Sequence, residues 1–235
     1  MHPLGDEAPL TGLPVCGEGS GLRRWLRVHD TPRIYADLAA IYDVFSRIAI
    51  PPSTVWARGD DAVRRSIDGL TPELAHVFAT LAGAVLGDVG LNPAHHDVEC
   101  WSNRLHAVGE RVELHVDNDE VVRASTGVVI TPRYGSIFYV GGSKAVGGTW
   151  FRAPLADVDQ DQDLFQRPHF ARVKEGGGMA VPFVAGRLVV FDGRMPHCVM
   201  PFTSVERPRV ALLCNVWPRG TFHARGRASP LGGPT

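Results

Sequence analysis

The chain has 235 residues, a length that fits one domain or one domain with a helical extension. Its formal net charge is -1 and charged residues make up 21%, so no broad surface for nucleic acid or for an anionic membrane is expected. No stretch is apolar enough to span a bilayer, and the N-terminus lacks the basic and apolar regions of a signal peptide. The four cysteines form no C-x-x-C pair and match neither a zinc site nor a disulfide framework. We therefore expect a cytoplasmic protein with no nucleic-acid or membrane partner.

The N-terminal part of the chain predicts helices. Residues 1–22 are rich in Gly and Pro and are expected to be irregular. Apolar residues then recur at three- and four-residue spacing over residues 33–48, as in an amphipathic helix. A second helix is predicted from the capping residue Thr71, with Pro72 in its first turn, to Leu86.

From about Val98 onward the sequence changes to short runs rich in β-branched and aromatic residues. Such runs, separated by Gly, Pro and Asp, predict a β-sandwich or barrel. The predicted strands are Glu113–Val116, Gly127–Thr131, Ser136–Val140, Thr149–Arg152, Met179–Val184, Arg187–Phe191, His197–Phe202 and Arg209–Val216. The expected fold is mainly β, with helices at the N-terminal side.

We expect one domain that is built from three parts. Residues 1–97 would hold the irregular segment and supporting helices, residues 98–220 the β-core, and residues 221–235 a tail. Residues 155–178 form a long polar stretch that begins acidic and ends in three glycines. Because loops of this length are uncommon inside a compact domain and are often functional, this segment is predicted to close over a pocket.

A candidate metal site begins with His115-Val116-Asp117. Alternate side chains of a strand share a face, so the imidazole and the carboxylate can point to the same side. A second histidine from another strand would complete a two-His-one-carboxylate site, which leaves positions open for a co-substrate and oxygen and suits non-heme iron(II). His197, on a later predicted strand, is the expected third ligand.

The H-x-D triplet alone is a weak signal, because His95-His96-Asp97 contains a second one. That triplet lies in a predicted loop after an Asn-Pro pair and has no ordered set of motifs behind it. We therefore expect His115 and Asp117 to bind the metal in preference to it.

An ordered set of further motifs accompanies the H-x-D strand. They are Ile137-Phe138-Tyr139, Gly147-Gly148-Thr149-Trp150-Phe151, Gly186-Arg187-Leu188-Val189-Val190-Phe191, Pro196-His197-Cys198-Val199-Met200-Pro201 and Arg209-Val210-Ala211-Leu212. In this order they resemble the iron(II)- and 2-oxoglutarate-dependent oxygenases of the prolyl-hydroxylase-like branch, over residues 103–217. The resemblance implies a double-stranded β-helix, that is, a cupin-like jelly roll. It also implies iron(II), 2-oxoglutarate and O2, with ascorbate in a supporting role.

The resemblance further implies residues that bind the co-substrate. A basic residue pairs with the distal carboxylate of 2-oxoglutarate, and a guanidinium suits this because its planar fork matches a carboxylate. Arg209 matches this position best, and Arg207 is the alternative because Pro208 leaves the register open. Tyr139 stands where the family often has a tyrosine that reaches the same carboxylate. His106 replaces the tyrosine of the family's Tyr-x-x-Gly motif and is the candidate at that position for a hydrogen bond to the co-substrate.

Substrate-binding residues are less well defined by the sequence. The candidates for lining the pocket are Trp101, Asn103, Trp150 and Arg152. The run Asn118-Asp119-Glu120 would either meet an amine or form a solvated loop, and we favour the loop.

The resemblance implies hydroxylation of an unactivated C–H bond. Related halogenases lack the carboxylate ligand, whereas this chain retains Asp117, so hydroxylation is favoured over halogenation; desaturation and ring formation stay open. By analogy with compact members of the branch, we expect a small-molecule substrate such as an amino acid or a natural-product intermediate. The alternatives are hydroxylation of a protein or peptide side chain, and a non-catalytic jelly roll that only binds metal.

Overall fold

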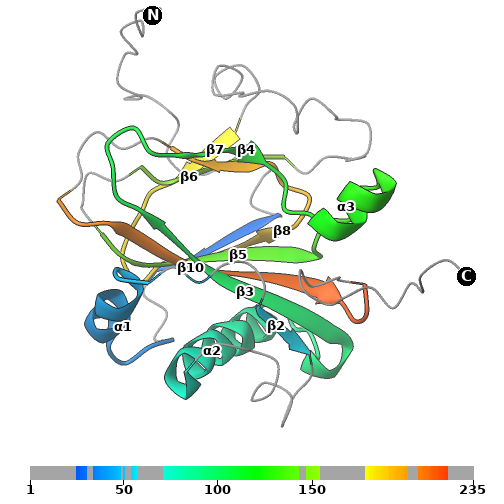
Figure 1. The fold of residues 1–235 in the computed structure, drawn as a ribbon, viewed down its shortest axis with the longest axis horizontal. Coiled ribbons are helices and arrows are strands. Elements are labelled where there is room, and N and C mark those ends of the chain that lie inside the picture. The colour runs from blue at the N-terminus through cyan, green and yellow to red at the C-terminus, as the bar shows by residue number, and fades with distance from the viewer. Residues whose placement is uncertain are drawn as a thin grey trace, which may run out of the picture.

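In the computed structural model, the described residues fold into two facing β-sheets, with the N-terminal helices against one outer side (Figure 1). These residues are 25–30, 34–48, 50, 54–57, 71–142, 147–153, 178–200 and 206–221. The strands are β1 (Leu26–His29), β2 (Thr54–Ala57), β3 (His96–Leu105), β4 (Val112–His115), β5 (Tyr134–Gly141), β6 (Thr149–Arg152), β7 (Gly178–Val181), β8 (Leu188–Asp192), β9 (His197–Val199) and β10 (Arg209–Pro218). The helices are α1 (Leu38–Phe45), α2 (Pro72–Asp88), α3 (Glu120–Thr126) and a short 3-10 helix at Pro93–His95.

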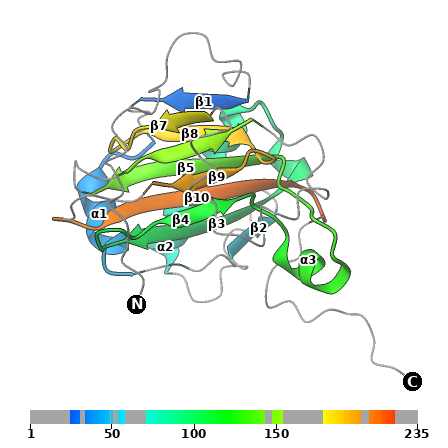
Figure 2. The ribbon, with the colours of Figure 1, turned by 90° about the horizontal axis from the view of Figure 1, so that it is seen from above.

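The described strands form one six-stranded and one four-stranded antiparallel sheet. The six-stranded sheet has the order β1-β8-β5-β10-β3-β2, and the four-stranded sheet has the order β4-β9-β6-β7. Strand β10 lies at the centre of the larger sheet and pairs with β3 along its whole length, from Arg209–Leu105 to Pro218–His96. In Figure 2 the edge strands of the larger sheet, β1 and β2, lie at opposite sides of the molecule.

Side-chain caps set the starts of the two N-terminal helices. The Thr71 side chain accepts a hydrogen bond from the Leu74 backbone N–H at 3.5 Å, and Pro72 occupies the first turn of α2, as predicted. Helix α1 begins later than predicted, because Asp37 caps it by accepting a hydrogen bond from the Ala40 backbone N–H at 3.0 Å.

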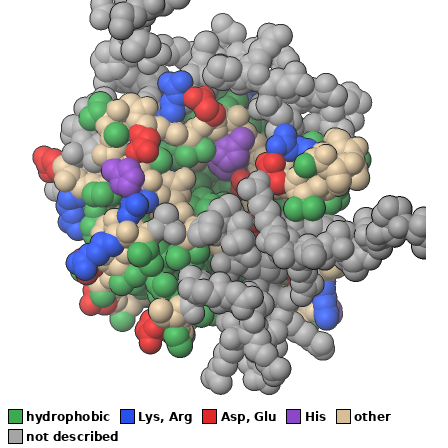
Figure 3. All heavy atoms as spheres, in the orientation of Figure 1, with side chains coloured by type: hydrophobic (Ala, Val, Ile, Leu, Met, Phe, Trp, Pro, Cys, Tyr) green, Lys and Arg blue, Asp and Glu red, His purple; other side chains and the backbone are tan. Residues whose placement is uncertain are grey.

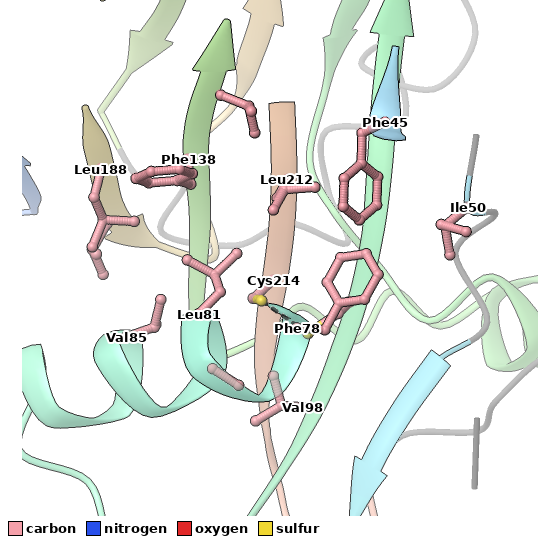
Figure 4. Close-up of a cluster of buried hydrophobic side chains, with 14 of the residues drawn as sticks. Phe45, Ile50, Phe78, Leu81, Val85, Val98, Phe138, Leu188, Leu212 and Cys214 are labelled. Atoms are coloured by element: carbon pink, nitrogen blue, oxygen red, sulfur yellow. Dashed lines mark hydrogen bonds between the residues drawn. The ribbon is translucent and has the colours of Figure 1, made fainter. Parts of the chain in front are cut away.

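The larger hydrophobic core lies between these helices and the six-stranded sheet (Figure 4). It includes Phe45, Phe78, Leu81, Val85, Phe138, Leu188 and Leu212. The sulfur atoms of Cys100 and Cys214 lie 2.9 Å apart in this core, because β3 and β10 pair at these two residues. This contact between two thiols was not expected from their spacing in the sequence.

A second core fills one end of the space between the sheets. The Phe151 and Phe191 ring centroids are 5.0 Å apart, and Phe191 packs edge-on against His197 with a centroid distance of 4.8 Å. The inner faces of both sheets supply these side chains, so this core fixes the separation of the sheets beside the histidine.

Several elements differ from the sequence-based predictions. Strands β1, β2 and β3 and helix α3 were not among the predicted elements, and the predicted strand at Gly127–Thr131 is wrong. Asp119 caps α3 by accepting hydrogen bonds from two backbone N–H groups, and Gly127 ends the helix in a left-handed conformation with φ of 75°. The apolar residues after Gly127 therefore follow a helix end and do not form a strand.

The sequence analysis also led to expectations about membrane spans, a loop over the pocket and the division of the chain. None of the helices in the described ranges is long and apolar enough to cross a membrane. Residues 155–177 of the predicted pocket-covering loop lie outside the described residues, and Gly178 begins β7. The division of the chain at residues 97 and 220 stays a prediction.

Gly148, just before strand β6, lies very close to the backbone at the end of β7. A Cβ atom added at Gly148 would overlap the Val181 carbonyl oxygen, whereas one added at Gly83, exposed on α2, would meet nothing within 4 Å. We expect Gly148→Ala to lower the free energy of unfolding by roughly 1–3 kcal/mol through steric overlap. Gly83→Ala, the matched control, should raise it by up to about 1 kcal/mol because alanine favours a helix. Urea unfolding of both variants measures the difference, and equal stabilities would contradict the predicted approach.

Candidate metal centre and adjoining cavity

Three side chains predicted to bind a metal meet at the inner face of the four-stranded sheet. His115 ends β4 and lies directly opposite His197, the first residue of β9. Asp117 follows two residues after His115, and its carboxylate lies 3.5 Å from His115 Nε2 and 3.8 Å from His197 Nε2. One ligand atom from each of the three residues lies within 4.8 Å of the others.

Backbone contacts orient both imidazoles. The Nδ1 atom of His115 is 2.7 Å from the Glu113 carbonyl oxygen, and Nδ1 of His197 is 3.1 Å from the Met195 carbonyl oxygen. Because a carbonyl oxygen can only accept, each neutral ring carries its proton on Nδ1 and presents the Nε2 lone pair to the site. Metal-binding histidines are commonly held in this way.

The three groups strongly influence one another's protonation. Burial opposes the charge on His115, but the Asp117 carboxylate outweighs it and raises the pKa of His115 above 6.5. Burial and the charge of His115 lower the pKa of His197 to about 4. Burial alone would raise the pKa of Asp117, yet the His115 hydrogen bond and the charges of both histidines lower it to about 2. The site therefore holds an ionised carboxylate and a neutral His197 at neutral pH.

This donor set fits a first-row transition metal. With metal–ligand bonds of about 2.1 Å, neighbouring donor atoms are about 3 Å apart, so the separations of 3.5 and 3.8 Å need only small adjustments. Two imidazoles and one carboxylate on one side of a metal leave positions open for other ligands, as non-heme iron(II) oxygenases require. In the part of the chain that the structure describes, no other group of three such residues meets the same distance criterion.

The competing H-x-D triplet has a different role. His95 is exposed at the end of the 3-10 helix. Asp97 is the second residue of β3, and its carboxylate accepts a hydrogen bond from the Gly220 backbone N–H at 2.7 Å. The structure thus engages Asp97 in a backbone contact with the segment after β10.

The metal-site residues open into a cavity of about 300 Å³ between the sheets. Figure 3 shows this face of the molecule, with a hollow that has hydrophobic side chains at its floor and a histidine beside it. The lining comprises Glu99, Trp101, Asn103, Val112, His115, Val116, Asp117, Asn118, Glu120, Val121, Ile137, His197, Val199, Arg209, Leu213 and Asn215. Of the predicted substrate residues, Trp101 and Asn103 therefore lie at the cavity.

Arg209 brings a buried positive charge to the same cavity. Only 1% of its surface is exposed, and its Nε atom has no hydrogen-bond partner. Its guanidinium carbon lies 5.2 Å from the ring centroid of Tyr139 and 5.8 Å from that of Phe183. Burial lowers the pKa of Arg209, although Tyr139 opposes this shift. Among the described residues, no carboxylate lies within 4.0 Å of this guanidinium, so the site can accept an anion.

The two other residues predicted near the co-substrate carboxylate do not line the cavity. Arg207 is exposed, and its guanidinium stacks on the Tyr42 ring at 4.3 Å. Tyr139 is fully buried, and its hydroxyl donates a hydrogen bond to the Thr149 side chain at 2.7 Å. Tyr139 can thus support Arg209 through its ring, while Arg207 points to a different environment.

The structure does not bring three further predicted site residues to the cavity. His106 is exposed in the turn after β3 and does not line the cavity. Trp150 is buried on the opposite face of β6 from Phe151. Its indole lies so close to Gly178 that a Cβ atom at that residue would overlap it. Arg152, at the end of β6, also lies outside the cavity lining. Strand alternation separates Trp150 from the inner face.

Sequence reasoning missed two buried polar residues of the cavity, Glu99 and Asn215. They face each other across β3 and β10, and each is less than a tenth exposed. Burial and the charge of Asp117 raise the pKa of Glu99 to about 7, while hydrogen bonds from Asn215 and Trp217 oppose the shift. The position of Glu99 between the apolar residues Val98 and Cys100 was the available signal for a strand face.

The run after the metal motif combines a structural role with a place at the cavity. Asp119 is fully buried and caps α3, as described above. Glu120 pairs with Arg123 at 2.6 Å, and the side chain of Asn118 donates a hydrogen bond to the Val116 carbonyl oxygen at 3.2 Å. The run is therefore the start of a helix, and not a solvated loop.

Comparison with solved structures identifies the fold. No protein-family model matches the sequence, and no curated protein matches it. A 2OG-Fe(II) oxygenase family protein from Burkholderia pseudomallei is similar with a TM-score of 0.52 and 15% identity, covering 86% of this chain and 92% of its own. AviO1 from Streptomyces viridochromogenes gives 0.54 and 15%, covering 87% and 95%. HygX from Streptomyces hygroscopicus, solved with nickel and 2-oxoglutarate bound, gives 0.54 and 13%, covering 85% and 84%.

These similarities show that the protein has the jelly-roll fold of the 2-oxoglutarate–iron(II) oxygenases, as the ordered sequence motifs predicted. At these identities the likeness concerns the fold. What the site does must be argued from its own geometry.

The unequal protonation of the two histidines can be measured in metal-free protein. By NMR of the imidazole nitrogens, we expect His115 to titrate above pH 6.5 and His197 to stay neutral until about pH 4. Asp117→Asn should lower the pKa of His115, because the carboxylate that favours its charged form is removed. Two histidines that titrate together, or a His115 that does not respond to Asp117→Asn, would contradict this arrangement.

Proposed function

We propose that the protein is an iron(II)- and 2-oxoglutarate-dependent oxygenase that hydroxylates a small molecule. The observation that carries this proposal is one cavity that holds both the His115–Asp117–His197 group and the buried Arg209. A buried cation costs free energy unless an anion accompanies it. A dicarboxylic co-substrate bound between a metal and this guanidinium would supply that anion.

His115, Asp117 and His197 would hold the metal. The two Nε2 lone pairs and the Asp117 carboxylate already face one another, so little reorganisation is needed on binding. When bound, iron(II) and 2-oxoglutarate supply the oxidising chemistry, in which O2 and 2-oxoglutarate give succinate and carbon dioxide while one oxygen atom enters a substrate C–H bond. The presence of Asp117 as a third ligand supports hydroxylation over halogenation.

The remaining residues would bind and orient the co-substrate. Arg209 can pair with the distal carboxylate through a planar, two-point contact, and the ring of Tyr139 limits the guanidinium's freedom. Ile137, Val199 and Leu213 add apolar walls to the cavity. Such walls exclude water and strengthen the charge interactions inside.

The size of the cavity supports a small-molecule substrate. Its volume of about 300 Å³ is at the lower end of the range for small-ligand pockets. Part of that space would be taken by the co-substrate. A compact substrate fits this cavity better than a bulky one.

Metal binding provides the first test of the proposal. We expect Asp117→Ala and His197→Ala each to weaken binding of Co²⁺ or Fe²⁺ at least about 100-fold, because three ligands act together. His95→Ala, which removes a histidine of the competing triplet, should leave the affinity unchanged. Calorimetric titration measures all three. An equal loss of metal affinity in His95→Ala, or normal metal binding in Asp117→Ala, would refute the assignment of His115, Asp117 and His197 as the metal ligands.

Co-substrate binding tests the role of Arg209. In protein loaded with Ni²⁺, Arg209→Met should weaken 2-oxoglutarate binding at least about 100-fold, since roughly 3 kcal/mol of charge-assisted hydrogen bonding is lost. Arg207→Met, two residues away and stacked on Tyr42, is the matched control and should bind normally. The proposal fails if Arg209→Met binds 2-oxoglutarate as tightly as the wild type. A loss confined to Arg207→Met would move the anchor to that residue.

A further inference from the structure

We propose that the β3 side of the cavity is a binding site for an ammonium group of the substrate, with Glu99 as its counter-ion. This inference rests on the proposed function only in taking the amine to be part of the oxygenase substrate. The binding site itself is defined by residues other than the metal ligands and Arg209.

The candidate residues lie side by side on the inner face of the larger sheet. Glu99, Trp101 and Asn103 alternate along β3, so their side chains share one face. In the neighbouring strand β10, Asn215 is directly opposite Glu99, and Leu213 is opposite Trp101. All five line the cavity, so β3 and β10 form a continuous patch with acceptor groups and one indole.

Several acceptors of this patch are buried and unsatisfied. Asn215 is 3% exposed, and its Oδ1 atom has no hydrogen-bond partner; the same is true of the buried Oδ1 atom of Asn103. Glu99 is 8% exposed and in its ionised form can only accept hydrogen bonds. Since unsatisfied buried acceptors cost free energy, a ligand that donates several hydrogen bonds would stabilise this patch.

The balance of charge distinguishes an ammonium group from a neutral donor. The charges of a divalent metal, Asp117, Arg209 and a dianionic co-substrate cancel one another. Glu120 at the cavity already pairs with Arg123 at 2.6 Å. Glu99 has no Lys, Arg or His partner within 4.0 Å among the described residues, so the loaded cavity would keep one uncompensated negative charge at β3. A substrate cation would neutralise it and favour the ionised carboxylate.

Trp101 adds a second reason to expect a cation. Its partly buried indole lies one step along the same strand face from Glu99. Ammonium groups bind against indole faces by cation–π attraction, which a hydroxyl group does not gain. A carboxylate, amide oxygens and an indole together therefore discriminate an amine from an alcohol of the same shape.

Matched amine and alcohol pairs test this inference. Calorimetric titrations at mildly alkaline pH would compare putrescine with 1,4-butanediol, and glucosamine with glucose, in Ni²⁺-loaded protein with and without 2-oxoglutarate. We expect an amine to bind at least about tenfold tighter than its alcohol partner in the wild type, a difference of about 1.4 kcal/mol. Glu99→Gln should reduce that preference to less than about twofold, because it keeps the shape of the side chain and removes its charge.

Controls separate this inference from the proposed function. Glu113→Gln removes a carboxylate outside the cavity lining and should keep the amine preference. Binding of Ni²⁺ and 2-oxoglutarate by Glu99→Gln should match the wild type. If the wild type binds no 2-oxoglutarate but prefers amines through Glu99, the oxygenase proposal fails and the ammonium site stands.

Two outcomes would overturn the ammonium site. One is a wild type that binds neither amine more tightly than its alcohol partner, a result that needs no variant to fold. The other is an amine preference that persists in Glu99→Gln while Ni²⁺ and 2-oxoglutarate still bind, which would place the cation elsewhere in the cavity.

Discussion

The alternation of side chains along β10 is the constraint on which the rest of the structure depends. Val210, Leu212, Cys214 and Val216 pack against the helices, whereas Arg209, Leu213 and Asn215 face the opposite sheet. Because successive side chains of a strand point to opposite faces, one central strand supplies both an apolar core and a polar cavity. A shift of one residue in its register would bury the Arg209 guanidinium in the helical core.

This arrangement separates the parts of the molecule that stabilise it from those that bind ligands. The larger core under α1 and α2, together with the aromatic cluster around Phe151 and Phe191, holds the sheets in place. The other end of the space between the sheets can then accommodate charged and unsatisfied groups that reduce stability when no ligand is present. His197 stands at the boundary, since its ring packs against Phe191 and its Nε2 atom faces Asp117.

The sequence could indicate the three residues of the metal site through two kinds of signal, one local and one based on the order of motifs. His115 and Asp117 are two residues apart at a strand end, and His197 was recognised from an ordered series of motifs. For the guanidinium, the motif after Arg209 favoured that residue, but Arg207 stayed an alternative because Pro208 left the register of the strand open. In the structure β10 begins at Arg209, and Arg207 remains before it, stacked on Tyr42. The same locality explains why the helix cap at Thr71 was predicted correctly.

Glu99 and Asn215 could not be recognised because their environment depends on packing between sheets. A strand with polar residues on one face and apolar residues on the other normally places the polar face in water. In β3 the apolar residues Val98 and Cys100 belong to the helix-covered core, so its polar face would be the exposed side of an isolated sheet. The four-stranded sheet covers that face and turns it into the wall of a cavity. A carboxylate that local pattern assigns to solvent is thereby buried, and burial is what gives it the capacity to select a charged ligand.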